Sequence, residues 1–382
     1  MLLKKENSPT KQKKKVLICS NYAWTIFNFR QPLINNLIKN NYEVELLTQF
    51  DGYENKITSQ LSGIHSLHIS RKGVNIITDL ITTLHIIFNL IRIKPDIILL
   101  YTIKPVIYGS IASKILKIPS IPMITGLGTT FISRSWITGV VKSLYKIALK
   151  KQKIVFFQNE EDKNLFLVEK LINKNQAKLV PGSGIDTKKY KYVKMSPKKK
   201  LTFLLIARMI KDKGVLEFVE AASMIKSKYQ NISFKILGPK SIQNRTAISD
   251  QVINEWQKKG VVEYLGETNN VLSFIVDSDC IVLPSYREGT SRVLLEAAAV
   301  GRPIITTNVP GCKEVVEDNI NGLLCKEKNS LDLSKKIEQM INFTNEERSQ
   351  MGIAGRNKVK KEFNANIVNK IYFNAINELN IV

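Results

Sequence analysis

Two glutamates that could contact one ligand, Glu288 and Glu296, lie in the stretch YREGTSRVLLEAAAVGRPI (286–304), with seven residues between them. Glu288 precedes Gly289 in a short loop, whereas Glu296 lies in a run of Leu and Ala that is typical of a helix. A carboxylate among apolar side chains is costly unless hydrogen-bond donors reach it, and the two hydroxyls of a ribose are suitable donors. The pair is therefore either a surface feature or two contacts to one bound molecule.

Basic side chains precede another predicted helix. The apolar segment 201–207 is followed by Arg208 and Lys213, and a helical pattern begins after Gly214. The N-terminus of a helix attracts anions through its free N–H groups and its dipole, and Arg and Lys add charge-assisted hydrogen bonds. This segment is therefore either a phosphate site or an exposed basic turn.

Small residues before the helix of Glu296 indicate a second anion site. Gly289, Thr290 and Ser291 follow the apolar segment 280–285 and leave backbone N–H groups accessible. A further tight loop, which contains Gly311, follows the segment 303–307. Since ligands of open parallel sheets bind beyond the carboxyl ends of the strands, we expect these loops to lie at one sheet edge.

Short apolar segments alternate with helical patterns along the chain, which is typical of parallel sheets covered on both faces. The predicted strands of the first half are 16–20, 43–48, 96–102, 121–125, 153–159 and 178–182, with helices near 30–39 and 76–91. Those of the second half are 201–207, 232–238, 262–266, 280–285, 303–307 and 322–325. We therefore predict an α/β protein, and its parts are a basic disordered tail (1–13), two Rossmann-like domains (14–190 and 191–361) and a C-terminal helix (362–382) that could cross back to the first domain.

The composition describes a soluble and strongly basic chain. Its 382 residues include 57 Lys and Arg against 33 Asp and Glu, and residues 1–190 alone hold 28 against 12. This excess favours an anionic partner of the N-terminal half, and the alternative is the Lys-, Asn- and Ile-rich composition of an AT-biased genome. A nucleic acid is not favoured as partner, because the aromatic residues do not alternate with basic ones as a stacking surface requires.

The sequence predicts neither a signal peptide nor a transmembrane helix, because the N-terminus has no apolar core and the most apolar window is interrupted by Asp79, His85 and Asn89. The four cysteines have no paired spacing, which is typical of reduced thiols. The three histidines have no metal-ligand spacing, so we expect no metal.

Several motifs together resemble a known family. They are R-x4-K-G (208–214), E-x7-E (288–296), A-x-G-x-P-I-I (299–305) and P-G-x-x-E (310–314). In this order they resemble the retaining nucleotide-sugar glycosyltransferases of family 4, which have the GT-B fold of two Rossmann-like domains facing an interdomain cleft. The segments NYAWTIFNFRQPL, YTIKPVIYGSIASK, ITGLGTTF and VPGSGID resemble the branch with undecaprenyl-diphosphate-linked N-acetylgalactosaminyltransferases of bacterial glycan assembly.

The resemblance implies catalytic and donor-binding roles. Arg208 and Lys213 would bind the donor diphosphate and stabilise the departing nucleotide, and Glu296 would hold the ribose. Glu288 and the amides of Gly289, Thr290 and Ser291 would contact the transferred sugar and the β-phosphate, and Gly238 would border the nucleobase. The donor would be a UDP-sugar, and no cofactor or metal is expected because cationic side chains stabilise the leaving group. The resemblance implies retention by same-face attack, with a covalent glycosyl-enzyme as the alternative.

Acceptor-binding candidates lie in the first half of the chain. They are Arg30, Lys104, Thr125, Gly126 and Gly128. Two departures from the family concern this half, because the loop after the first strand has no Gly-Gly pair and TGLG stands where many members have a histidine. We therefore assign no catalytic histidine.

A basic amphipathic pattern at 136–153 bears on the membrane. Lys142, Lys146 and Lys150 recur every four residues, and apolar side chains occupy another side. Such a helix can lie on an anionic bilayer, and the alternative is an ordinary packed helix with a solvated lysine face.

Taken together, the resemblance implies a hexosyl- or N-acetylhexosaminyltransferase, with N-acetylgalactosamine favoured, that acts on a polyprenyl-diphosphate-linked saccharide in O-antigen, capsule or related polysaccharide synthesis. It would be cytoplasmic and peripheral on the inner face of the plasma membrane. The alternatives are a lipopolysaccharide-core or capsule transferase, a non-catalytic GT-B scaffold and a basic RNA-binding protein.

Overall fold

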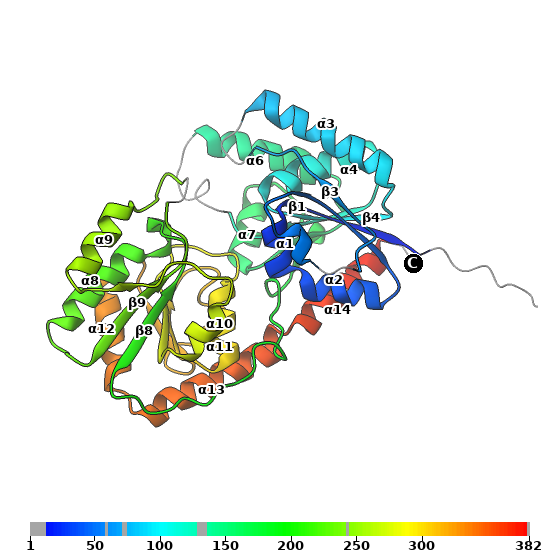
Figure 1. Ribbon diagram of the computed structural model, residues 1–382. Helices are drawn as coiled ribbons and strands as arrows, with labels where there is room; N and C mark the ends of the chain where they lie inside the picture. The colour runs from blue at the N-terminus through cyan, green and yellow to red at the C-terminus, as the bar shows by residue number, and fades with distance from the viewer. Residues whose placement is uncertain (1–12, 58–59, 71–74, 128–135, 242–243, 380–382) are drawn as a thin grey trace, which may run out of the picture. The chain divides into compact units, whose positions relative to one another are not determined.

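A computed structural model describes residues 13–57, 60–70, 75–127, 136–241 and 244–379 of the protein (Figure 1). The chain forms two compact units. The first comprises residues 1–123, 144–155 and 372–382, and the second comprises 124–143 and 156–371.

The first sheet has seven strands in the order β3-β2-β1-β4-β5-β6-β7. Their bounds are β1 Lys15–Tyr22, β2 Glu43–Gln49, β3 Gly63–Ser66, β4 Ile97–Tyr101, β5 Ser120–Ile124, β6 Val155–Phe157 and β7 Ala177–Leu179. Strand β1 pairs in parallel with β2 and β4, and β2 pairs in parallel with β3. All predicted strands of this half are present, and β3 is the strand that the sequence did not indicate, because its four residues are too short for a periodic pattern.

The second sheet has six strands in the order β10-β9-β8-β11-β12-β13. Their bounds are β8 Leu201–Ile206, β9 Ile232–Leu237, β10 Glu263–Tyr264, β11 Cys280–Leu283, β12 Ile304–Thr307 and β13 Gly322–Cys325. Every pair in this sheet is parallel. The predicted α/β fold with two parallel, Rossmann-like sheets is therefore confirmed.

Helices connect the strands. Those of the first part of the chain are α1 Ala23–Phe29, α2 Gln31–Lys39, α3 Ile76–Ile93, α4 Ser110–Ile115, α6 Trp136–Leu149 and α7 Glu160–Val168. Those of the second part are α8 Val215–Lys226, α9 Asp250–Lys258, α10 Val271–Val276, α11 Arg292–Val300, α12 Ser330–Asn342, α13 Asn345–Glu362 and α14 Ala365–Glu378. Figure 1 shows α8, α9 and α12 beside β8 and β9. Strands β11 and β12 are buried along their whole length, because apolar side chains cover the second sheet on both faces.

Helix α6 corresponds to the predicted basic amphipathic helix. Its apolar residues Val141, Ala148 and Leu149 are buried, and Lys142 forms an ion pair with Glu169 at 2.6 Å. These three apolar side chains are therefore packed inside the protein, whereas Ile147 of the same helix is 56% exposed. Lys146 and Lys150 are exposed, and contact of α6 with a bilayer stays a prediction.

Candidate functional site

The loops with the predicted donor-binding residues follow neighbouring strands. Strand β8 pairs with β11, and β11 pairs with β12. The loops after these three strands therefore start at one edge of the sheet, as predicted. Tyr286 N donates to Asp212 O at 2.9 Å and Glu288 N donates to Pro310 O at 3.0 Å, so the loops are hydrogen-bonded to one another.

Lys213 and Glu288 are brought together by this arrangement. Lys213 ends a short 3₁₀ turn, and Gly214 then starts α8 with a φ of 70°. Lys213 Nζ donates to Glu288 Oε1 in an ion pair whose side chains are 19% and 15% exposed. The ion pair is thus partly buried but still open to solvent.

The other predicted donor-binding cation, Arg208, is exposed directly after β8. Gly238, which was predicted to border the nucleobase, follows the neighbouring strand β9 with a φ of 142°. Its carbonyl oxygen accepts a hydrogen bond from the Tyr264 hydroxyl at 2.8 Å. Both residues lie at the same sheet edge as Lys213.

Gly289 and Gly311 allow close approach of backbone around Glu288. A Cβ atom at Gly289 would lie 2.2 Å from Thr125 O, and one at Gly311 would lie 2.4 Å from the carbonyl carbon of Glu288. Gly311 also has a φ of 81°, which favours glycine. The structure therefore places Thr125 and Gly126, two predicted acceptor-binding residues, directly against the predicted donor loop.

Thr290 and Ser291 connect this loop to α11. Thr290 Oγ1 donates to Gln158 O at 3.3 Å, and Ser291 N donates to Gly311 O at 2.9 Å. Ser291 is the N-cap of α11 and is buried, and its side chain makes no capping hydrogen bond. The start of α11 is thus fixed by neighbouring backbone.

Glu296 is buried within α11 and has two hydrogen-bond donors. Its Oε1 accepts from the Tyr190 hydroxyl at 2.8 Å and from Arg292 Nε at 2.9 Å. Arg292 also donates to Gly184 O at 2.6 Å. Burial, and then the nearby Glu296 carboxylate, raise the pKa of the Tyr190 hydroxyl, so it remains protonated and donates. These contacts hold the Glu296 carboxylate in one orientation.

A further ion pair, whose Asp162 side chain is fully buried, contacts the loop of Glu288. Arg287 donates to the carboxylate of Asp162, a residue of α7 with no exposed side-chain surface. Asn159 Nδ2 donates to Gly289 O at 2.9 Å. Burial raises the pKa of the Asp162 carboxyl, and the Arg287 guanidinium opposes this shift. The Glu288–Gly289 turn is therefore held by polar contacts on both sides.

Five side chains of this network were not predicted from the sequence: Tyr190, Arg292, Arg287, Asp162 and Asn159. Arg292 precedes Glu296 by four residues, a spacing at which opposite charges meet on a helix, so that pair could have been found. The Tyr190 and Asp162 contacts join residues more than 100 positions apart, and no local pattern indicates them.

The predicted acceptor residues Arg30 and Lys104 belong to the first unit and are engaged there. The Arg30 guanidinium lies 3.9 Å from the centroid of the Tyr101 ring, and Lys104 Nζ lies 2.7 Å from Asp79 Oδ1. Gly128 lies outside the described residues. Their roles in acceptor binding stay predictions.

The site offers electrostatic stabilisation rather than nucleophilic chemistry by a thiol. Arg208 and Lys213 supply positive charge, and Glu288 and Glu296 supply carboxylates suited to sugar hydroxyls. Burial raises the pKa of the nearby Cys312 thiol to about 12, so Cys312 is not a thiolate at neutral pH. Among the described residues, no group of three or more His, Cys, Asp and Glu is arranged to hold a metal ion.

Comparison with known families agrees with this geometry. Residues 15–159 match the family "Glycosyl transferase 4-like", and residues 186–358 match the family "Glycosyl transferases group 1". The chain therefore belongs to the GT-B glycosyltransferases, with a 4-like domain followed by a group 1 domain. The resemblance inferred from the motifs is confirmed.

Three proteins that are similar to most of this chain are also glycosyltransferases. The chain is 29% identical over 334 residues to the Campylobacter jejuni N,N'-diacetylbacillosaminyl-diphospho-undecaprenol alpha-1,3-N-acetylgalactosaminyltransferase, covering 83% of this chain and 86% of that protein. It is 26% identical to the Staphylococcus aureus capsular polysaccharide biosynthesis glycosyltransferase CapM, covering 88% and 90%. It is 25% identical to the Escherichia coli UDP-Gal:alpha-D-GlcNAc-diphosphoundecaprenol alpha-1,3-galactosyltransferase, covering 77% and 78%.

Solved structures share the fold. A glycosyltransferase from Rickettsia africae superposes with a TM-score of 0.77 at 18% identity, covering 96% of this chain and 99% of that one. Anabaena HepE in complex with UDP and glucose gives a TM-score of 0.77 at 15% identity, covering 95% and 99%. At such identities the likeness concerns the fold alone.

Proposed function

We propose that this protein is a retaining glycosyltransferase that moves a hexose or N-acetylhexosamine, with N-acetylgalactosamine favoured, from a UDP-sugar to a polyprenyl-diphosphate-linked saccharide. The observation that carries the proposal is the similarity, over 83% of the chain, to a transferase whose acceptor is a diphospho-undecaprenol saccharide. A second relative that uses UDP-Gal and a diphosphoundecaprenol acceptor supports the same class of substrates.

The donor diphosphate binds where β8 and β11 end. Lys213 and the exposed Arg208 neutralise the diphosphate, and the N–H groups before α11 contact the β-phosphate. Glu296, held by Tyr190 and Arg292, binds the ribose hydroxyls with its remaining lone pairs. Preorganised positive charge at the departing UDP supplies the catalysis, and no metal is required.

Transfer proceeds with retention by attack on the face that UDP leaves. The acceptor hydroxyl gives its proton to a departing phosphate oxygen while the bond from the anomeric carbon to that phosphate breaks. Glu288 contacts the transferred sugar, next to Thr125 and Gly126 on the acceptor side of Gly289. The acceptor is a membrane lipid, so the enzyme acts as a peripheral protein on the cytoplasmic face of the bacterial plasma membrane in surface glycan synthesis.

A substrate screen tests this function. The purified protein is incubated with a panel of UDP-sugars and a short-chain lipid-diphosphate saccharide, with and without a metal chelator, and the products are analysed by mass spectrometry and NMR. We expect transfer of one sugar as the α-anomer, unaffected by chelation, and a loss of at least a hundredfold in Lys213→Met. A β-linked product would refute the mechanism, and so would a rate of transfer by Lys213→Met equal to that of the wild type.

Capsule synthesis is a second candidate for the pathway, because the similarity to CapM covers 88% of this chain. A non-catalytic scaffold is the contrasting class. Hydrolysis or transfer of the donor by the wild type but not by Glu288→Ala rules out the scaffold.

A further inference from the structure

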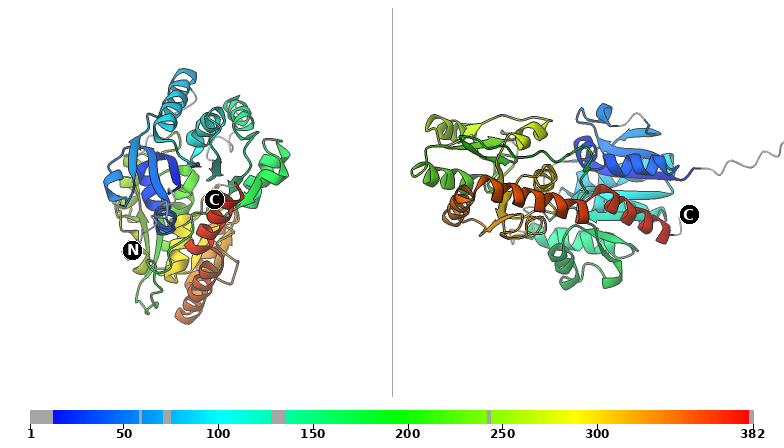
Figure 2. Two further views of the ribbon diagram at one scale, coloured as in Figure 1. Left: turned by 90° about the vertical axis from the view of Figure 1, so that its right-hand side faces the viewer. Right: turned by 90° about the horizontal axis from the view of Figure 1, so that it is seen from below.

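Helix α3 exposes an apolar face that nothing in the described part of the chain covers. This face, called here the outer face of α3, consists of six large side chains, each more than half exposed: Ile77, Leu80, Ile81, Leu84, Phe88 and Ile91. Their spacing places them on one side of the helix. Figures 1 and 2 show α3 at the margin of the first unit, beside α4.

The opposite side of α3 is fixed to the protein, partly by polar groups. Asp79 is buried and forms the ion pair with Lys104, and Thr82 Oγ1 donates to His68 O at 3.1 Å. Asn89 is also buried. An ordinary surface helix buries apolar residues and exposes polar ones. In α3 these three polar side chains lie inside together with three apolar ones (Ile86, Leu90 and Ile93), while the six large apolar side chains of the outer face are exposed. An exposed apolar face of this size is typical of a surface that binds an apolar partner.

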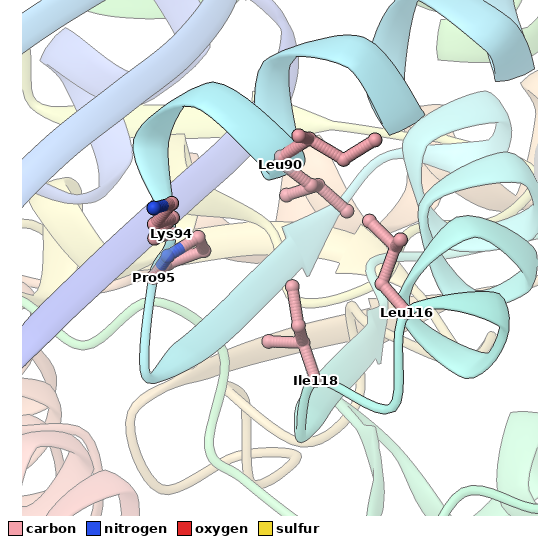
Figure 3. Close-up of a pocket in the computed structure, with 6 residues that line it drawn as sticks. Leu90, Lys94, Pro95, Leu116 and Ile118 are labelled. Carbon is pink, nitrogen blue, oxygen red and sulfur yellow. The ribbon is translucent and has the colours of Figure 1, made fainter.

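The outer face continues into a hollow at the end of the helix. This hollow has a volume of about 280 Å³ and is lined by Leu90, Ile91, Lys94, Pro95, Leu116 and Ile118. Figure 3 shows the apolar side chains directed into it, with Lys94 at its margin. The apolar surface therefore extends from α3 to the end of α4.

Cationic residues border this surface. Arg92, Lys94, Lys114 and Lys117 are exposed near the hollow, and the only acidic residue of α3, Asp79, faces inward. The first unit as a whole carries 20 Lys and Arg against 8 Asp and Glu. Two copies of so basic a unit would repel each other, whereas anionic lipid headgroups would complement the charge.

We propose that the outer face of α3 docks on an anionic lipid bilayer, with the helix lying in the plane of the interface and the four cations contacting headgroup phosphates. By length and composition α3 could also cross a membrane. Its buried Asp79 and Thr82 contacts, however, hold one side of it on the protein, which fits an interfacial helix. The purpose of this docking rests on the proposed transfer to a lipid-linked acceptor, but the docking itself requires no substrate.

Vesicle flotation tests the docking surface. The full chain is mixed with vesicles of equal parts phosphatidylglycerol and phosphatidylcholine, or of phosphatidylcholine alone, at low and high salt. The triple variant Leu80→Gln, Leu84→Gln and Phe88→Gln is compared with a control at three apolar residues of the second unit that are also more than half exposed, Val168→Gln, Ile320→Gln and Leu331→Gln. All six positions are exposed, so we expect both variants to fold, and thermal unfolding confirms this.

We expect the wild type and the control variant to float with anionic vesicles and to be released by alkaline carbonate. Losing about one buried apolar side chain weakens binding roughly tenfold, so the α3 variant should bind on the order of a hundredfold or more weakly. Neutral vesicles and high salt should each weaken binding, by roughly fivefold per cation in contact.

Three results would overturn the docking proposal: equal flotation of the α3 variant, resistance of the wild type to carbonate, or dimerisation that the α3 variant abolishes. Transfer to a water-soluble short-chain acceptor is measured in parallel and should be unchanged in the α3 variant. If the wild type floats but transfers no sugar, the proposed function fails while the docking surface stands. If it transfers sugar but does not float, the docking surface fails while the proposed function stands.

Discussion

Glu288 gives the sharpest test of where the diphosphate binds. Its carboxylate pairs with Lys213, and both side chains are less than one fifth exposed. If Lys213 binds the donor diphosphate, the phosphate must share this lysine with Glu288 and lies close to a second negative charge. The substitution Glu288→Gln removes the charge but keeps the shape, so we expect it to tighten the binding of UDP while it impairs transfer.

The magnitude follows from the distances. A phosphate oxygen on Lys213 would lie on the order of 5 Å from the Glu288 carboxylate, where two like charges repel by roughly 3 kcal/mol at an effective dielectric constant of about 20. Screening in a partly exposed site reduces this by about half. A gain of about 1.4 kcal/mol corresponds to a tenfold lower Kd for UDP.

Isothermal titration calorimetry with UDP and with a UDP-sugar measures the effect. The UDP-sugar should gain less than UDP, because Glu288→Gln also weakens the contact with the sugar, and transfer should fall roughly a hundredfold, or about 2.7 kcal/mol. Glu338→Gln, which breaks the exposed pair with Lys228 elsewhere in the second unit, is the control and should change neither value. Unchanged or weaker UDP binding in Glu288→Gln would show that Lys213 does not bind the diphosphate.

Three further predictions concern other parts of the structure. Tyr190→Phe removes a hydrogen bond to the buried Glu296 carboxylate and should lower the free energy of unfolding by about 1.5–3 kcal/mol in urea denaturation; an unchanged midpoint refutes the contact. Gly289→Ala places a Cβ 2.2 Å from Thr125 O, so transfer should fall at least tenfold while circular dichroism stays native; full activity refutes the close approach. Burial, together with a neighbouring histidine, lowers the pKa of His85 below its ordinary 6.5, so the unfolded chain takes up this proton first and stability should fall as the pH drops below that value. His85→Gln should show a smaller fall in melting temperature between neutral and mildly acidic pH than the wild type does.

The sequence predicted those parts of the site that depend on strand order. Arg208, Lys213 and Glu288 each follow an apolar strand, and in a parallel sheet the residues after neighbouring strands meet at one edge. The pairing of β8 with β11 then brings Lys213 to Glu288. This inference needs only the fold class and the position of each residue along its strand.

The contacts across long sequence distances could not be predicted in this way. Tyr190 reaches Glu296 because the segment after Gly184 runs beside α11, and that path depends on packing rather than on a local pattern. The same holds for α3, whose periodicity correctly predicts a helix. Periodicity alone does not say which side faces the protein. Here Asp79 pairs with Lys104 on the inner side, while six large apolar side chains are exposed on the outer side.

The two glutamates of the E-x7-E motif differ in how freely each can change its partner. Glu296 is buried and held by two donors from separate segments, so its carboxylate keeps one orientation. If it binds the ribose as proposed, it need not move when the donor binds. Glu288 is held, among the described side chains, by Lys213 alone, and a lysine ammonium on a flexible stem can turn to a new anion at little cost. A diphosphate that takes up Lys213 would leave Glu288 free to accept hydrogen bonds from the sugar. The exchange would couple donor binding to the release of the carboxylate that contacts the transferred group, which is why removal of the Glu288 charge should separate UDP binding from transfer.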